Sequence, residues 1–132
     1  ELLCVQHAVE RRDEAELNML EEELLIQKNQ SISDTEFCDS DVRFHRILAD
    51  ATHNSVLQFI MFSVIEALQP IENMVVFRVR DRKVVISQHQ KMVDALKQRD
   101  ETSATEAVKE QTVYLNERFQ FVQKMRKKKR AK

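Results

Sequence analysis

The sequence predicts an all-α protein folded as a helix bundle. Its 132 residues include no glycine and one proline, so few positions favour hairpin turns or phosphate-binding loops. Hydrophobic residues make up 42% of the chain and charged residues 33%, a balance typical of amphipathic helices with one buried and one solvated face. Helices of this kind bury their apolar faces by packing against one another.

Apolar spacing and stop signals divide the chain into six helical segments. The first two cover residues 1–12 and 13–29, and Asp13 can cap the second with its carboxylate. Ser33 or Asp34 can cap the third, which ends near residue 52.

The fourth segment, residues 56–80, is the longest apolar stretch and can be capped by Asn54 or Ser55. It contains Pro70, which lacks a backbone N–H and should kink the helix or split it in two. The fifth segment covers residues 81–98.

Asp100 can cap the sixth segment, residues 101–126, which carries acidic residues in its first turns. The last nine residues, "KMRKKKRAK", hold seven basic side chains. We therefore expect one bundle over residues 1–126, followed by a basic, disordered tail at 127–132.

Composition also limits the classes of function. The formal net charge of −1 gives no overall attraction to nucleic acid, and no apolar run approaches the roughly 20 residues that span a bilayer. Cys4 and Cys38 fall at apolar helix positions, which predicts reduced, packed thiols in a cytoplasmic protein. Because Glu1 opens in the middle of a helical pattern, we expect a domain cut from a longer chain.

Four polar residues interrupt the apolar faces of three predicted helices. At about 100° per residue, Asp41 and His45 face inward from the third helix, His89 from the fifth and Gln111 from the sixth. An unpartnered buried carboxylate costs several kcal/mol and a neutral polar group roughly 1–3 kcal/mol. The four side chains must therefore satisfy one another or a bound species.

A divalent metal is one solution. Asp41 and His45 are spaced i, i+4 on one helical face and can offer an oxygen and a nitrogen, and His89 can complete the set. These ligands suit Zn²⁺, Ni²⁺ or a similar ion. The equal alternative is a metal-free network in which Asp41 is hydrogen-bonded to His45 or His89 and Gln111 completes the set. Helical spacing alone does not separate the two.

A divalent metal bound by these residues would also attract an anionic small molecule. One carboxylate leaves about +1 of local charge in a low-dielectric pocket, which attracts a small carboxylate. Arg78, Arg80 and Arg82 follow the fourth segment. Most such charges are solvated, but one could reach back to a bound carboxylate, because a guanidinium pairs with it through two hydrogen bonds.

Two stretches carry a family resemblance. "DVRFHRILADATHNSVL" resembles the D-x-x-F-H…A…N…L signature of the FCD domain, the ligand-sensing C-terminal domain of FadR-type GntR transcriptional regulators. "QHQKMVDALKQRDETSATEAV" is similar to the family's H-x-x-[IM]-x-x-A-[IL]-x-x-x-D-x-x-x-A segment. The resemblance implies an antiparallel bundle of six or seven helices that acts as a homodimer. It also implies DNA binding only through an N-terminal winged helix-turn-helix domain, which this sequence lacks.

The resemblance implies a particular ligand set. Many members of the family bind a divalent metal through one Asp and three His, and the first three match Asp41, His45 and His89. The fourth position is Gln111. An amide oxygen is a weaker, neutral ligand, so Gln111 is a doubtful one. We expect Zn²⁺ first, with Ni²⁺ or another divalent ion as alternatives.

Family effectors are typically small organic acids such as lactate, citrate or sugar acids. By resemblance, a carboxylate would lie beside the metal, with Arg78 or Arg82 and Asn54 as candidate contacts. Its binding would change how the bundle packs on its DNA-binding partner and on a second protomer, and so alter operator affinity. Some members lack the metal and bind acyl-CoA, which is the first alternative.

Two other classes of function remain. A helical metal-dependent hydrolase or lyase would use a metal-bound water, but Glu66 and Glu72, the acidic residues of the fourth segment, do not clearly face inward as general bases. A pure interaction bundle with a satisfied polar core is the other. The sequence favours a regulatory, non-enzymatic domain.

Overall fold

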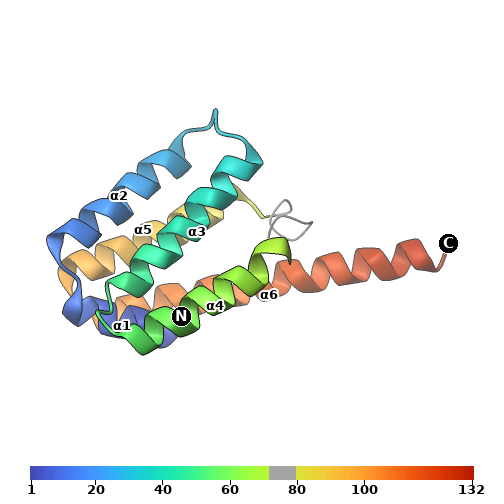
Figure 1. The fold of residues 1–132 in the computed structure, drawn as a ribbon. Helices are drawn as coiled ribbons and strands as arrows, with labels where there is room; N and C mark the ends of the chain where they lie inside the picture. Colours follow the sequence, from blue (N-terminus) through green and yellow to red (C-terminus); the bar gives the residue numbers. More distant parts are fainter. Residues whose placement is uncertain (72–79) are drawn as a thin grey trace.

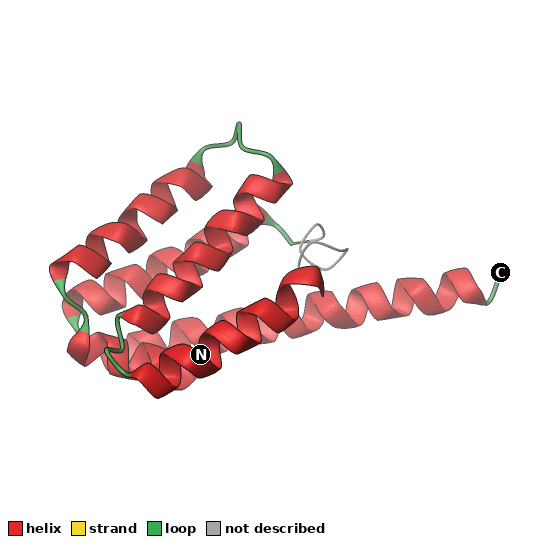
Figure 2. Cartoon of the chain, in the orientation of Figure 1, coloured by secondary structure: helices red, strands yellow, loops and turns green. Residues whose placement is uncertain are grey.

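The structure is a computed structural model that describes residues 1–71 and 80–132 (Figure 1). The described residues form six helices and no strand, which confirms the all-α prediction (Figure 2). The helices are α1 (Leu2–Arg11), α2 (Glu14–Lys28), α3 (Asp34–Asp50), α4 (Ser55–Ile71), α5 (Arg82–Gln98) and α6 (Glu101–Arg130).

Helix α1 packs against α3, α5 and α6. Helix α2 packs against α3 and α5, and helix α4 packs against α3. Figure 1 shows α2 and α3 as neighbouring, antiparallel helices, and α6 extending beyond the rest of the bundle toward the C-terminus. The core lies where α2, α3 and α5 meet, around the fully buried Leu20, Phe44 and Leu96. Burying each such side chain contributes roughly 1.5–3 kcal/mol.

The predicted caps explain where three helices begin. Asp13 Oδ1 accepts a hydrogen bond of 2.8 Å from the Glu16 backbone N–H, and the Glu16 carboxylate accepts one of 2.9 Å from the Asp13 N–H. Ser33 makes the same reciprocal pair at the start of α3. Asp100 Oδ1 accepts from the Ser103 N–H at 3.1 Å at the start of α6. These bonds satisfy backbone donors that the first turn of a helix leaves unpaired.

The connection from α5 to α6 uses an arginine where many proteins use glycine. Arg99 has a φ of 54°, in the left-handed region. Its guanidinium donates hydrogen bonds to the carbonyl oxygens of Val9, Glu10 and Arg12 at the end of α1, at 2.9 to 3.3 Å. We attribute the tolerance of this backbone conformation to these three bonds.

One predicted boundary differs in the structure, and another falls outside the described residues. Helix α4 is described through Ile71, and residues 72–79 of the predicted fourth segment lie outside the described residues. Helix α6 runs through Arg130 rather than ending at 126. No glycine or proline stops it, and basic side chains in its last turn interact favourably with the negative end of the helix dipole.

Cys4 and Cys38 are buried thiols that form no disulfide, as the sequence predicts. Among the residues described, no helix is both long and apolar enough to cross a membrane.

Candidate metal centre

Helices α3 and α5 bring three of the predicted ligands together. Asp41 and His45 lie one turn apart on α3, and His89 faces them from α5. One ligand atom from each of the three lies within 4.8 Å of the others. Asp41 Oδ1 is the shared point, at 3.2 Å from His45 Nε2 and 3.3 Å from His89 Nε2. The inward orientation predicted from helical periodicity is therefore what the structure has.

Packing fixes the planes of the two imidazoles. The Phe44 ring stacks on His89 with centroids 4.1 Å apart and planes 16° apart. The His45 ring meets His89 edge-on, at 5.2 Å and 76°. Because His89 is 1% exposed, its ring has no room to swing away from Asp41.

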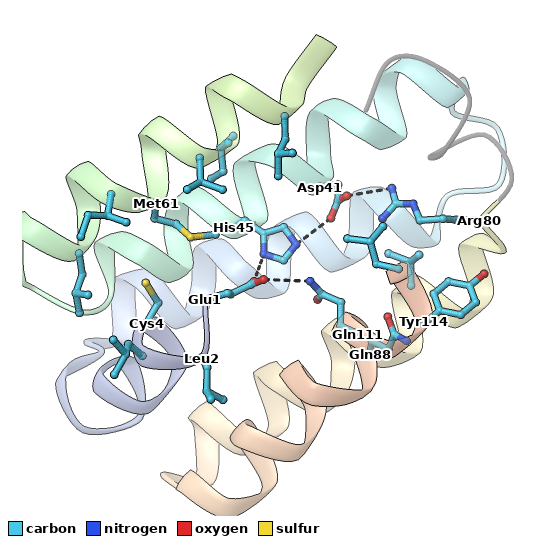
Figure 3. Close-up of a pocket in the computed structure, with 18 residues that line it drawn as sticks. Glu1, Leu2, Cys4, Asp41, His45, Met61, Arg80, Gln88, Gln111 and Tyr114 are labelled. Atoms are coloured by element: carbon cyan, nitrogen blue, oxygen red, sulfur yellow. Dashed lines mark hydrogen bonds and ion pairs between the residues drawn. The ribbon is translucent and has the colours of Figure 1, made fainter. Parts of the chain in front are cut away.

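Asp41 faces positive or proton-donating groups on both sides. Its Oδ2 accepts a 3.0 Å bond from Arg80 Nη2, while its Oδ1 faces His45 Nε2 (Figure 3) and also His89 Nε2 from α5. Burial alone would raise the pKa of Asp41. The hydrogen bond with His45, together with the charge of Arg80, instead holds that pKa well below its usual range. Asp41 is therefore an ionised carboxylate in the core.

Glu1 is a site residue that sequence reasoning missed. Its carboxylate pairs with His45 Nδ1 and accepts a 3.1 Å bond from Gln111 Nε2. Burial would lower the pKa of His45, but the charge of Glu1 and the hydrogen bond to Asp41 raise it well above the usual value. Glu1 has a lowered pKa, because the effect of His45 outweighs burial. Glu1 lies on no predicted apolar face, so periodicity gave no signal for it.

His89 is in the state that a metal requires. Burial lowers its pKa despite the opposing negative charge of Asp41, so the ring is neutral near pH 7. A neutral imidazole can offer a nitrogen lone pair to a metal, whereas a protonated one cannot, so His45, whose pKa is raised, would release its proton when a metal binds.

The donor set fits a divalent cation such as Zn²⁺. One carboxylate oxygen and two imidazole nitrogens are typical zinc ligands, and three protein ligands leave a position open. Tetrahedral zinc with bonds of about 2.0–2.1 Å places neighbouring ligand atoms about 3.3–3.4 Å apart. The 3.2 and 3.3 Å separations around Asp41 Oδ1 match that spacing.

Gln111 lies in the same cavity but is engaged with Glu1 through its amide nitrogen. Its Oε1 is buried and has no hydrogen-bond partner among the described atoms. Gln111 would bind a metal as the fourth ligand through that oxygen.

The candidate metal centre opens into a cavity of about 490 Å³. Its polar side includes Glu1, Asp41, His45, Arg80 and Gln111. An apolar wall faces them, and most of it comes from one side of α4 (Figure 3): Leu57, Ile60, Met61, Val64, Ile65 and Leu68. A cavity of this size, with an apolar wall and few polar groups, is typical of small-molecule sites.

Two of the three effector contacts predicted by resemblance, Arg82 and Asn54, do not line this cavity. Arg78 falls outside the described residues. Arg82 donates to the Ile32 carbonyl oxygen at 2.9 Å and pairs with Asp34, and it does not line this cavity. Asn54 caps α4 by accepting from backbone N–H groups, and it too is absent from the lining.

Arg80 is instead the arginine that lines the cavity among the described residues. It belongs to the three arginines singled out from the sequence, but it lies outside any helix, where no periodicity indicates its direction.

A second cluster of metal-type side chains has a structural explanation. Asp13, Glu16 and His53 lie close together. Asp13 and Glu16 form the cap of α2, and the His53 ring, half exposed, pairs with Glu16 at 2.7 Å.

Comparison with known proteins agrees with this architecture. The FCD domain family matches residues 1–112. The "Uncharacterized HTH-type transcriptional regulator YcbG" of Bacillus subtilis (strain 168) is 32% identical over 100 residues, which cover 76% of this chain and 41% of that protein. The "HTH-type transcriptional repressor NanR" of Cronobacter sakazakii (strain ATCC BAA-894) is 27% identical over 130 residues, covering 97% and 49%.

NanR of Citrobacter rodentium (strain ICC168) is 33% identical over 107 residues, covering 79% of this chain and 41% of that protein. The chain thus spans less than half the length of each of these curated relatives. From the family match over residues 1–112, the chain belongs to the FCD domain family.

Proposed function

We propose that this chain is the effector-sensing domain of a FadR-type GntR transcriptional regulator, and that it binds a small carboxylate at a buried divalent metal. The FCD family match and relatives named as HTH-type transcriptional regulators support the regulatory part. The metal part rests on one observation: Asp41 Oδ1 lies 3.2 and 3.3 Å from the Nε2 atoms of His45 and His89.

Asp41 Oδ1, His45 Nε2 and His89 Nε2 would hold the ion, with Zn²⁺ the first candidate and Ni²⁺ or another divalent ion the alternatives. The Gln111 amide oxygen is available as a weaker fourth ligand. The bound ion would supply positive charge that attracts an anionic oxygen into the open position.

The residues around the cavity favour a small organic acid. Arg80 can pair with a carboxylate by sharing the guanidinium that now binds Asp41 Oδ2. The α4 wall would cover the apolar part of the effector. Arg82 and Asn54 would contact it only after leaving their present hydrogen bonds, and Arg78 is a further candidate.

Effector binding would draw α3, α4 and α5 together around the ion and change how the domain packs on its partners. We expect DNA binding through a winged helix-turn-helix domain elsewhere in the full protein, action as a homodimer, and a cytoplasmic location. Exposed apolar side chains on α4 and α6, among them Val56, Phe59, Val113 and Phe121, offer surfaces that a second protomer would cover.

We expect no enzymatic activity. Glu66, the described acidic residue of α4, is 72% exposed and lies beside Arg46, so it is not a general base at the ligands.

A metal-free FCD domain is the second candidate. Asp41 already receives Arg80 and His45 as partners without an ion, and the apolar α4 wall would accept an acyl chain such as that of an acyl-CoA.

A thermal-shift screen of small organic acids separates the two candidates. Each acid is tested with the zinc-loaded protein and after chelation. Stabilisation that the chelator removes supports the metal-anchored sensor, and stabilisation by acyl-CoA that survives the chelator supports the alternative.

A further inference from the structure

A chain of buried hydrogen bonds runs behind the metal centre, on the side of His89 that faces away from Asp41. Gln27 Oε1 lies 2.8 Å from His89 Nδ1, and Gln27 Nε2 donates to Ser40 Oγ at 3.2 Å. Ser40 Oγ donates to Glu23 Oε2 at 2.7 Å. Gln27, Ser40 and His89 are all at most 1% exposed, so no solvent competes for these bonds.

Glu23 determines which group donates and which accepts in each of these hydrogen bonds. Its carboxylate accepts from Arg43 Nε at 2.8 Å and from Arg43 Nη2 at 3.2 Å, as an ionised carboxylate does. An ionised carboxylate has no proton to donate, so the Ser40 hydroxyl proton must point to Glu23. Ser40 Oγ then has only lone pairs left for Gln27, which must present its NH₂ group to it.

The Gln27 amide is thereby oriented with its oxygen toward His89. An amide oxygen only accepts, so His89 Nδ1 must carry the hydrogen of this 2.8 Å bond. A neutral imidazole carries one N–H, which leaves His89 Nε2 with a lone pair. That lone pair faces Asp41 Oδ1, itself an acceptor, at 3.3 Å.

Two acceptors face each other across this gap, and a cation between them would satisfy both. A metal-bound histidine characteristically donates its other ring N–H to a fixed oxygen, which orients the ring. Gln27 supplies such an oxygen from α2, a helix that contributes none of the three predicted ligands.

We propose that Gln27, held by Ser40 and Glu23, is a positioning residue that keeps His89 in the Nδ1–H tautomer with Nε2 directed at the metal position. The proposal rests on the metal site proposed above. Its first consequence, the tautomer of His89, is nevertheless measurable without any metal.

Long-range ¹H–¹⁵N NMR of the full chain, labelled with ¹⁵N-histidine and stripped of metal, reports which ring nitrogen carries the proton. A His89→Gln variant assigns the His89 signals. We expect a protonated Nδ1 and an unprotonated Nε2 in the wild type. In Gln27→Met, which keeps the shape and removes the acceptor, His89 should shift toward the Nε2–H tautomer, because Nε2–H can donate to Asp41.

Zn²⁺ affinity, measured by competition with a chelating dye, is the second readout. Loss of such an orienting partner typically weakens metal binding by about 10- to 100-fold, and we expect that loss for Gln27→Met. Ser40→Ala keeps Gln27 but leaves its amide free to rotate, so we expect its Zn²⁺ affinity to lie between those of the wild type and Gln27→Met. This variant also tests the proposal if Gln27→Met does not fold. Gln6→Met is the matched control, because Gln6 bonds to Thr105 and touches no ligand.

The outcomes separate this inference from the proposed function. If the wild type shows the Nε2–H tautomer, or if Gln27→Met and Ser40→Ala leave both tautomer and Zn²⁺ affinity unchanged, the positioning role is overturned while the metal site stands. If the predicted tautomer is present and shifts in Gln27→Met but the wild type binds no divalent metal, the proposed function fails and the positioning role toward a metal fails with it.

Discussion

Arg80 Nη2 lies 3.0 Å from Asp41 Oδ2, so the two oxygens of one buried carboxylate have different partners: a guanidinium on one side and two imidazoles on the other. The arrangement leaves Oδ1 available to a metal while Arg80 neutralises the carboxylate. It also places a guanidinium at the cavity where an anionic effector would enter.

Replacing Arg80 should separate effector binding from metal binding. Arg80→Met removes the charge-assisted pair with a carboxylate, a loss of about 1.5–3 kcal/mol or roughly 10- to 100-fold in affinity. We expect isothermal titration with an effector found in the acid screen to show that loss, with Zn²⁺ still bound. Arg82→Met is the matched control and should leave both affinities unchanged. An effector affinity unchanged in Arg80→Met would show that Arg80 does not contact it.

Breaking the Asp41–Arg80 pair should destabilise the metal-free fold. Asp41→Asn removes the carboxylate from a guanidinium that is 8% exposed, and breaking a buried pair costs about 3–5 kcal/mol. Urea unfolding in chelator measures this. The double variant Asp41→Asn/Arg80→Met should recover part of the loss, because no uncompensated charge remains. Additive losses would mean that the two side chains do not interact.

Asn54 should act on stability alone. Its Oδ1 accepts from the backbone N–H groups of Val56 and Leu57, at 3.0 and 3.1 Å. Asn54→Ala should therefore lower the unfolding free energy by about 1 kcal/mol and leave metal and effector affinities as they were. A clear loss of effector affinity at unchanged stability would instead restore Asn54 as an effector contact.

The left-handed Arg99 offers a test of the α5–α6 connection. Arg99→Ala loses three hydrogen bonds to α1 and keeps an unfavourable φ, whereas Arg99→Gly loses the same bonds and removes the backbone strain. We expect both to be destabilised, with Arg99→Gly more stable than Arg99→Ala by about 1 kcal/mol in urea unfolding. The reverse order would contradict the strain assigned to this position.

Cys4 should report on the cavity. Burial raises the pKa of its thiol, so at pH 8 it should be alkylated by iodoacetamide far more slowly than an exposed cysteine. Because Cys4 lines the cavity, a bound effector should slow the reaction further, measured by mass spectrometry in a Cys38→Ala background. Effector-independent alkylation would indicate that ligands bind elsewhere.

Much of the fold followed from local chemistry. The sequence predicts Asp13, Asp100 and either Ser33 or Asp34 as caps, because their side chains can bond the first backbone N–H groups, and Asp13, Ser33 and Asp100 do so. The inward direction of Asp41 and His89 followed from the 3.6-residue period. The end of α6 does not follow in the same way, because its basic last turns predict a solvated tail, while no glycine or proline stops the helix before Arg130.

The remaining site residues depend on tertiary structure. Arg80 lies outside any helix and Glu1 lies on no predicted apolar face, so periodicity assigns a direction to neither. Gln27 is buried on α2 only because that helix packs between α3 and α5. Such contacts join residues far apart in the sequence, and a local pattern does not encode them.

The metal content of the untagged chain, measured by mass spectrometry beside an Asp41→Ala/His89→Ala variant, tests the central claim most directly. The proposed metal centre predicts about one divalent ion per chain in the wild type and none at this site in the variant. A wild type without metal after growth and purification with Zn²⁺ or Ni²⁺, or a variant with the same metal content, would contradict it.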